Sequence, residues 1–161
     1  MNVDALYSKI IPPPTREARD GFSNEHILNA LGEKERNEIE SRLLSDLDNA
    51  DHWDSLVVST LINLKSEKAL EKMTDLLNSE SDFFKRIVMA SAIYQLSGNT
   101  AMIEVAVSAF KSRTKKYSIL SMMNHLSKIR EPEIMQLMEE LAHSKDSVVR
   151  FNANVLIERM K

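Results

Sequence analysis

The chain has 161 residues, of which 43% are hydrophobic and 28% charged, with a formal net charge of −3. This length and composition predict one globular domain, and three glycines with four prolines are too few for a turn-rich all-β fold. The absence of cysteine excludes disulfides and thiolate metal sites. Without an 18-residue apolar run or a signal-like start, we expect a cytoplasmic protein with no membrane segment.

The first 20 residues combine a short apolar cluster with three consecutive prolines. Leu6, Tyr7, Ile10 and Ile11 precede prolines at positions 12–14. Proline fixes φ and lacks the amide donor, so this stretch is expected to be extended. We therefore expect residues 1–22 to form an N-terminal arm with a proline-rich strap outside the regular structure. Residues 23–161 are expected to form a single domain.

Nearly all of the chain after residue 22 has helical periodicity. The pattern predicts helices over 24–31, 33–48, 52–64, 67–78, 82–97, 100–113, 115–129, 132–143 and 147–160. Several starts carry N-cap or first-turn signals, namely Ser23, Ser66, Thr100, Pro132 and Asp146, and Gly32 is expected to end the first helix. The connections are short, so consecutive helices should be antiparallel neighbours. The predicted core includes Leu61, Leu64, Ile93, Leu96, Leu126, Ile129, Leu156 and Ile157.

Landmarks recur along the chain with a period of about 32 residues. Asp82 and Asp146 each stand four residues before an arginine, Arg86 and Arg150, and the two pairs are 64 residues apart. Steps of about 32 also join the expected helix starts Asp51, Asp82, Thr114 and Asp146, and the expected helix ends Leu64, Leu96 and Ile129. Two helices per repeat are typical of a helical solenoid.

The last repeat resembles the HEAT-repeat family. Its first helix begins Asp146-Ser147-Val148-Val149-Arg150-Phe151-Asn152-Ala153-Asn154-Val155-Leu156, which is similar to the family pattern of Asp, Val-Arg, Ala and Leu. Residues 64–70 resemble the family's inter-helix turn, and the likeness covers about 51–161 and less clearly 33–49. It departs at Thr114 and Ser118, where Asp and Arg are expected. The resemblance implies an all-α, right-handed α–α superhelix of antiparallel helix pairs, used as a binding scaffold without implying one activity.

Charge is distributed unevenly between the two helices of each pair. The first helices carry a balance of +5, the second helices −3 and residues 1–50 −4. In a HEAT-like superhelix the second helices resemble those that line the concave face, which would make that groove acidic. A groove that grips a phosphate backbone needs Lys and Arg instead, so the distribution argues against nucleic acid as the partner.

The candidate binding residues are acidic and aromatic side chains. An acidic ridge suited to a basic protein is predicted from Glu67, Glu71, Asp75, Glu104, Glu133, Glu139 and Glu140. The alternative is a solvated face in which Lys68 and Lys72 pair with these carboxylates. Aromatic residues in the first turns of successive first helices are Trp53, Phe83, Phe84 and Tyr117, of which Trp53 and Phe83 are candidate interface residues. Alternatively, these aromatic side chains serve packing.

The basic cluster has a structural interpretation. Lys111, Arg113, Lys115 and Lys116 fall at an inter-helix turn, where cations satisfy the last carbonyl groups of the preceding helix. The competing interpretation is a contact with nucleic acid.

No pattern in the sequence predicts catalysis. The histidines His26, His52, His125 and His143 lie on four different predicted helices without metal-ligand spacing. Adjacent carboxylates such as Glu139 and Glu140 point about 100° apart on a helix and cannot flank one bond. We therefore predict a protein that is not an enzyme and has no catalytic residue, cofactor or metal site.

These observations lead to a binding function. We predict a protein-binding module, and by analogy of fold and charge an immunity- or antitoxin-type protein that neutralises a basic, nuclease-like toxin by occluding its active site. The alternatives are a scaffold or adaptor without inhibitory role and a nucleic-acid-binding or DNA-repair module. A monomer or weak homodimer without membrane contact is expected.

Overall fold

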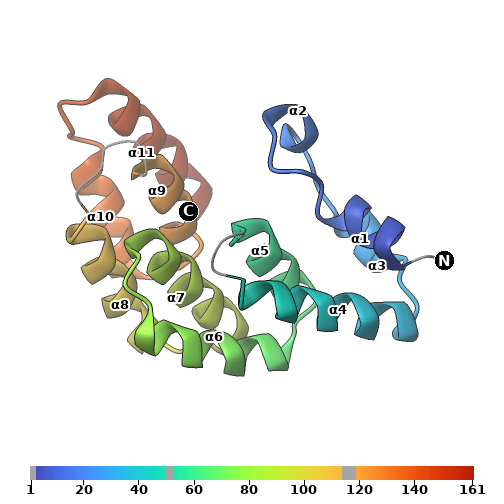
Figure 1. Cartoon of the computed structure of the whole chain (residues 1–161). Coiled ribbons are helices and arrows are strands. Elements are labelled where there is room, and N and C mark those ends of the chain that lie inside the picture. Colours follow the sequence, from blue (N-terminus) through green and yellow to red (C-terminus); the bar gives the residue numbers. More distant parts are fainter. Residues whose placement is uncertain (1–2, 50–52, 114–118) are drawn as a thin grey trace. The chain divides into compact units, whose positions relative to one another are not determined.

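The computed structural model describes residues 3–49, 53–113 and 119–161, and within these ranges it contains eleven helices and no strand (Figure 1). The prediction of an all-α protein is therefore confirmed. The chain divides into two compact units, Met1–Lys72 (unit 1) and Met73–Lys161 (unit 2). The boundary expected after residue 22 does not coincide with this division. None of the described helices combines the length and apolarity required to cross a bilayer.

Unit 1 is built around one long helix. Its elements are α1 (Val3–Ile10), α2 (Arg16–Arg19), α3 (Glu25–Asn29), α4 (Glu33–Leu47), α5 (Ser55–Asn63) and the first half of α6 (Glu67–Ser79). Helix α4 packs against both α1 and α5. The apolar side chains buried in this unit include Leu6, Ile10, Leu28, Ile39, Leu43, Leu47, Val57, Val58 and Leu61.

The expectation that the N-terminal arm lies outside the regular structure is wrong. Residues Val3–Ile10 form a helix whose buried face consists of Leu6, Tyr7 and Ile10, the residues of the apolar cluster. Their i, i+1, i+4 spacing places them on one side of two helical turns, which packs against α4. The prolines lie between α1 and α2, and the Arg19 guanidinium donates to the Pro12 carbonyl at 2.8 Å.

Unit 2 consists of two layers of helices. Its elements are α7 (Phe83–Ser97), α8 (Ala101–Lys111), α9 (Ile119–Leu126), α10 (Pro132–Leu141), α11 (Ser147–Met160) and the second half of α6. Contacts run from α7 to α9 and from α9 to α11, while α8 contacts α10. Helix α7 also packs along α8, and α10 along α11 (Figure 1). We call α7, α9 and α11 the odd layer and α8 and α10 the even layer.

The two Asp–Arg pairs, Asp82–Arg86 and Asp146–Arg150, form hydrogen bonds that stabilise the starts of α7 and α11. Asp82 accepts a hydrogen bond from the Lys85 amide at 2.9 Å, and Asp146 accepts one from the Val148 amide at 2.9 Å. Each arginine donates to a carbonyl group that precedes its helix: Arg86 to the Glu80 carbonyl at 2.9 Å and Arg150 to the Ser144 carbonyl at 2.8 Å. In both cases the acceptor lies two residues before the capping aspartate, so the 64-residue spacing reflects a repeated local structure.

The other start and stop signals have mixed outcomes. Ser66 caps α6 by accepting from the Ala69 amide at 3.0 Å, and Pro132 stands at the start of α10, both as predicted. Gly32 begins α4 instead of ending α3, because its amide donates to the Glu35 carboxylate at 3.2 Å. Thr100 forms no side-chain cap hydrogen bond. Asn24, and not Ser23, precedes α3 as the N-cap residue.

The predicted 32-residue spacing of the helix starts is irregular in the first repeats. Asp54 caps α5 by accepting from the Leu56 amide at 2.9 Å, whereas Asp51, the expected start, lies outside the described residues, as does Thr114. Six of the eight predicted core residues are buried, and Leu96 and Ile157 are only half-buried. Leu96 falls in the last turn of α7, after the buried stretch of that helix ends at Ile93.

Candidate protein-binding surface

The acidic residues of α6 form one exposed stripe. Glu67, Glu71 and Asp75 follow one another at four-residue spacing and all are exposed. The pairing with the neighbouring lysines, part of the alternative interpretation, is not found: Lys68 lies 3.8 Å from Glu40 on α4, and Lys72 lies 2.5 Å from Asp48, which follows α4. Among the described residues, these two lysines therefore do not compensate the charge of the stripe.

The even layer carries the remaining predicted carboxylates. Glu104 on α8 and Glu133, Glu139 and Glu140 on α10 are all exposed, and the two helices are in contact. Neither these four nor the three of the α6 stripe form an ion pair with any residue that the structure describes. We name these seven residues the acidic set.

The aromatic candidates differ in accessibility. Phe83, the first residue of α7, is 36% exposed and accessible to a partner. Phe84 is half-buried and packs edge-on against the His125 ring at 5.6 Å between centroids, which confirms that the adjacent phenylalanines do not both point inward. Trp53 is half-buried beside the α5 cap, and Tyr117 lies outside the described residues.

His125 is a packing residue rather than a reactive one. Burial, assisted by the positive charge of Lys128, lowers the pKa of its imidazole to about 4, so the ring is neutral at physiological pH. The Ser91 hydroxyl donates to the His125 carbonyl at 2.8 Å and not to the ring. Within residues 3–49, 53–113 and 119–161 no three His, Asp or Glu side chains converge as metal ligands.

In the described part of the basic cluster, Arg113 contacts the end of the preceding helix, α8. The Arg113 guanidinium lies 3.5 Å from the centroid of the Phe110 ring and donates to the Phe110 carbonyl at the end of α8. Burial lowers the pKa of Arg113. The prediction that this cluster satisfies terminal carbonyls is thus confirmed for Arg113. Lys111 is exposed, and Lys115 and Lys116 lie outside the described residues.

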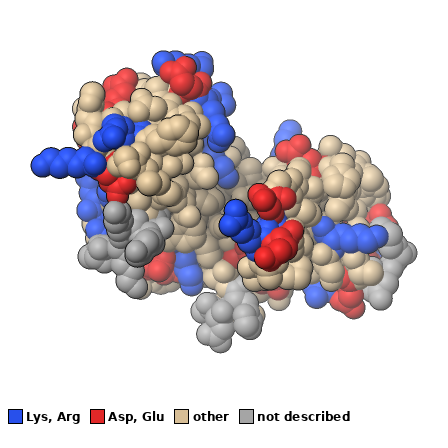
Figure 2. Space-filling model, turned by 90° about the horizontal axis from the view of Figure 1, so that it is seen from above, with Lys and Arg blue, Asp and Glu red and all other residues tan. Residues whose placement is uncertain are grey.

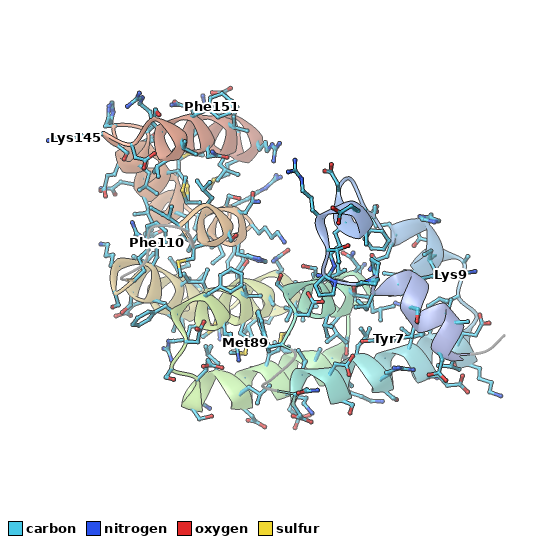
Figure 3. All side chains as sticks on the ribbon, turned by 45° about the horizontal axis from the view of Figure 1, so that its top comes forward. Tyr7, Lys9, Met89, Phe110, Lys145 and Phe151 are labelled. Atoms are coloured by element: carbon cyan, nitrogen blue, oxygen red, sulfur yellow. The ribbon has the colours of Figure 1, made fainter. Side chains whose placement is uncertain are left out.

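An exposed apolar pair on α11 was not among the residues predicted from the sequence. Phe151 is 68% exposed and Val148 is 54% exposed. The buried face of this helix consists of Val149, Ala153, Leu156 and Met160, at spacings of four, three and four residues. Phe151 and Val148 lie off that stripe, so a helical-wheel reading could have found them. Figure 3 shows Phe151 on the outer side of α11.

The exposed candidate residues are thus of two kinds, the carboxylates of α6, α8 and α10 and the apolar side chains of Phe83 and of the pair on α11. On the face of unit 2 seen in Figure 2, Lys and Arg side chains stand along the edges. Searches with this chain found no matching family model, no similar curated protein and no similar solved structure.

Proposed function

We propose that this chain is a protein-binding module of HEAT-like helical repeats whose acidic set binds a basic protein. The observation that carries the proposal is that all seven carboxylates are exposed and without an ion-pair partner among the described residues. Uncompensated negative charge attracts a positively charged partner at long range and accelerates the encounter.

The superhelical arrangement is part of the same proposal. The two layers of unit 2 and the repeated helix start at Asp82 and Asp146 support a solenoid of antiparallel helix pairs. A solenoid offers an extended surface on which charges from successive helices act together. The right-handed sense of the superhelix is proposed from the resemblance to HEAT repeats alone.

In its specific form, the module neutralises a nuclease-like toxin as an immunity protein does. Such an enzyme binds nucleic acid through Lys and Arg side chains, and a carboxylate surface occupies the same cations. Binding would then exclude the substrate without any chemistry by the inhibitor. This form rests on analogy of fold and charge with small acidic immunity proteins.

A second candidate, a non-inhibitory adaptor, is favoured by a different observation. Exposed aromatic side chains are frequent interface hot spots, and Phe151 with Val148 forms an apolar pair on α11 that needs no charge on the partner. An adaptor that binds mainly through this pair would tolerate charge reversal of the acidic set.

One set of variants distinguishes the two functions. The acid-reversed variant replaces Glu71, Asp75, Glu139 and Glu140 by Lys, a second variant is Phe151→Ala, and Lys111→Glu is the control for a surface charge change. Each is used to capture partners from native lysate, with the product of the neighbouring reading frame as first candidate. The neutraliser requires a basic partner whose binding and nuclease inhibition fail in the acid-reversed variant. The adaptor function is supported if only Phe151→Ala loses partner binding and the wild-type protein does not inhibit its partner.

A further inference from the structure

A cavity of about 330 Å³ opens in unit 2 at the odd layer. Residues from α7, from the end of α9 with the turn that follows it, and from α11 line this cavity. Three of them are cations: Lys128 and Arg130 from the segment after α9, and Arg159 from α11. The acidic set of unit 2 lies instead on α6 and the even layer, so the cavity is a separate site.

The positive charge of this cavity is not compensated. None of the residues that line it is acidic, and none of its three cations forms an ion pair with a residue in the described ranges. Of the two carboxylates next to these cations in the sequence, Glu158 pairs with Lys161 at 2.7 Å, and Glu131 keeps its charge while it accepts from the Tyr94 hydroxyl at 2.5 Å. Lys128 is exposed by surface area, but desolvation by the protein atoms around it lowers its pKa, and an anion in the cavity would raise this pKa again.

The remaining lining supplies groups of two other kinds. Gln95 and Asn124 contribute side-chain amides, of which the Gln95 nitrogen already donates to the Ser91 carbonyl at 3.1 Å, while amide oxygens can accept hydrogen bonds. Leu156 and Met160, which are 5% and 8% exposed, form an apolar part of the wall. Polar and charged side chains thus make up most of the lining, which suits a charged ligand, and about 300 Å³ is the lower end of the volumes of small-molecule sites.

We infer that this cavity binds a small phosphate ester, such as a nucleoside diphosphate. Three cations match an anion with two to three negative charges, and the planar guanidinium groups of Arg130 and Arg159 suit paired phosphate oxygens. The apolar wall and the amides would contact the organic part of the ester. The cations gather in one cavity instead of following a track, which favours a small ligand over a nucleic-acid backbone.

Calorimetric titration with ADP tests this site, with inorganic pyrophosphate and succinate as further probes. The test variants are Arg130→Gln/Arg159→Gln and Lys128→Gln, and Lys111→Gln/Lys145→Gln is the matched control because it removes two exposed cations outside the cavity. We expect one ADP per chain, affinity at least about tenfold lower in the double test variant, and affinity within about twofold of wild type in the control, since tenfold corresponds to losing one charge-assisted contact. Circular dichroism verifies that each variant is helical.

Chemical-shift mapping provides a readout that does not depend on the variants. In the wild-type protein, ADP should shift the side-chain amide signals of Gln95 and Asn124 more than that of Asn29, which is exposed in unit 1. The inference is overturned by the absence of ADP binding, by equal loss in the control, or by shifts elsewhere. It is also overturned if succinate binds as tightly as pyrophosphate, or if a single-stranded decanucleotide binds more tightly than ADP and loses affinity equally in test and control variants.

Discussion

The two units connect their helices by different means. In unit 1 charged side chains link separate segments: Arg19 pairs with Asp54, Arg42 with Asp4, Lys68 with Glu40 and Lys72 with Asp48. In the described part of unit 2, the side-chain hydrogen bonds between helices include those from the neutral hydroxyl groups of Ser91 and Tyr94 and one from the Arg86 guanidinium to the Leu77 carbonyl at 3.4 Å. Lys161 and Glu158, near neighbours at the end of α11, also form an ion pair.

This difference follows from the length and the apolar content of the helices. In α7 an uninterrupted run, from Ile87 to Ile93, is buried, and Phe110 and the buried methionines of α9 extend the same core. The N-terminal part of unit 1 has short helices, α1 to α3, which bury few side chains each and gain additional support from polar contacts. Unit 2 should therefore respond most to cavity-forming changes, and unit 1 to loss of hydrogen bonds and ion pairs.

The largest effect is expected from emptying the core of unit 2. Phe110 is 1% exposed, so Phe110→Ala should lower the free energy of unfolding by about 3–5 kcal/mol. Phe151→Ala is the matched control, because that side chain is 68% exposed and its loss leaves no cavity. Thermal unfolding followed by circular dichroism measures both. Equal destabilisation by the two substitutions would contradict the assignment of the core.

Acid should weaken unit 2 through His125. Its folded-state pKa of about 4 lies below the usual value of 6.5, so between these pH values the unfolded chain binds a proton that the folded chain does not. Stability therefore falls as the pH decreases from 6.5 to 4, by at most about 1.4 kcal/mol per pH unit. Denaturant unfolding across this range should show a shallower pH dependence in His125→Gln than in the wild type. An unchanged slope would show that the ring is solvated.

A smaller effect is expected from the buried polar link in unit 1. The Asn24 side chain, 4% exposed, donates to the Ile10 carbonyl at 3.1 Å and to the Thr60 hydroxyl at 2.8 Å. Asn24→Ala leaves that carbonyl unsatisfied and should cost about 1–3 kcal/mol. Hydrogen exchange of the α1 amides reports the loss locally. The control is Asn29→Ala at the end of α3, the helix that Asn24 precedes, because the Asn29 side chain is exposed.

The smallest effect should come from the ion pair Arg19–Asp54, which links α2 to the start of α5. Desolvation tends to raise the pKa of the Asp54 carboxyl, but hydrogen bonds from Arg19 and the Leu56 amide, with the Arg19 charge, hold it below its usual range. Arg19→Ala should raise this pKa in an NMR titration and cost about 1 kcal/mol, because the pair is partly exposed. Stability from Asp54 is present above the unfolded-state pKa and is lost as the pH falls through the folded-state value. Arg16→Ala, an exposed change in α2, should leave the titration unaltered.

The sequence predicts the long helices well because their boundaries are fixed locally. The expected helix over 147–160 matches α11, since Asp146 caps it as expected, and that over 82–97 differs from α7 by one residue, because Asp82 is the N-cap and not the first helical residue. Helix α1 was missed because two turns before a proline run have little intrinsic stability, and contact with α4 supports them.

The candidate sites also differ in whether local sequence or tertiary packing determines them. Exposure of the acidic set follows from helical periodicity within single helices, which is a local property. The cavity cations could not be predicted, because residues 95, 124–130 and 156–160 meet only through the packing of α7, α9 and α11. Exposure of Phe151 depends on which neighbours cover α11, although its position off the buried stripe is visible in the sequence.

The central claim, that the acidic set binds a basic protein, is tested most directly by titrating the purified partner at two salt concentrations. Wild-type protein should bind with an association rate that falls as salt increases, because opposite charges steer the encounter. The variant with Glu71, Asp75, Glu139 and Glu140 replaced by Lys should bind at least about a hundredfold more weakly, since each lost or repulsive charge contact adds to the penalty. Lys111→Glu should stay within about threefold of wild type, because a charge outside the interface changes mainly the encounter rate. Unchanged affinity in the reversed variant, with its helical signal intact, would contradict the claim.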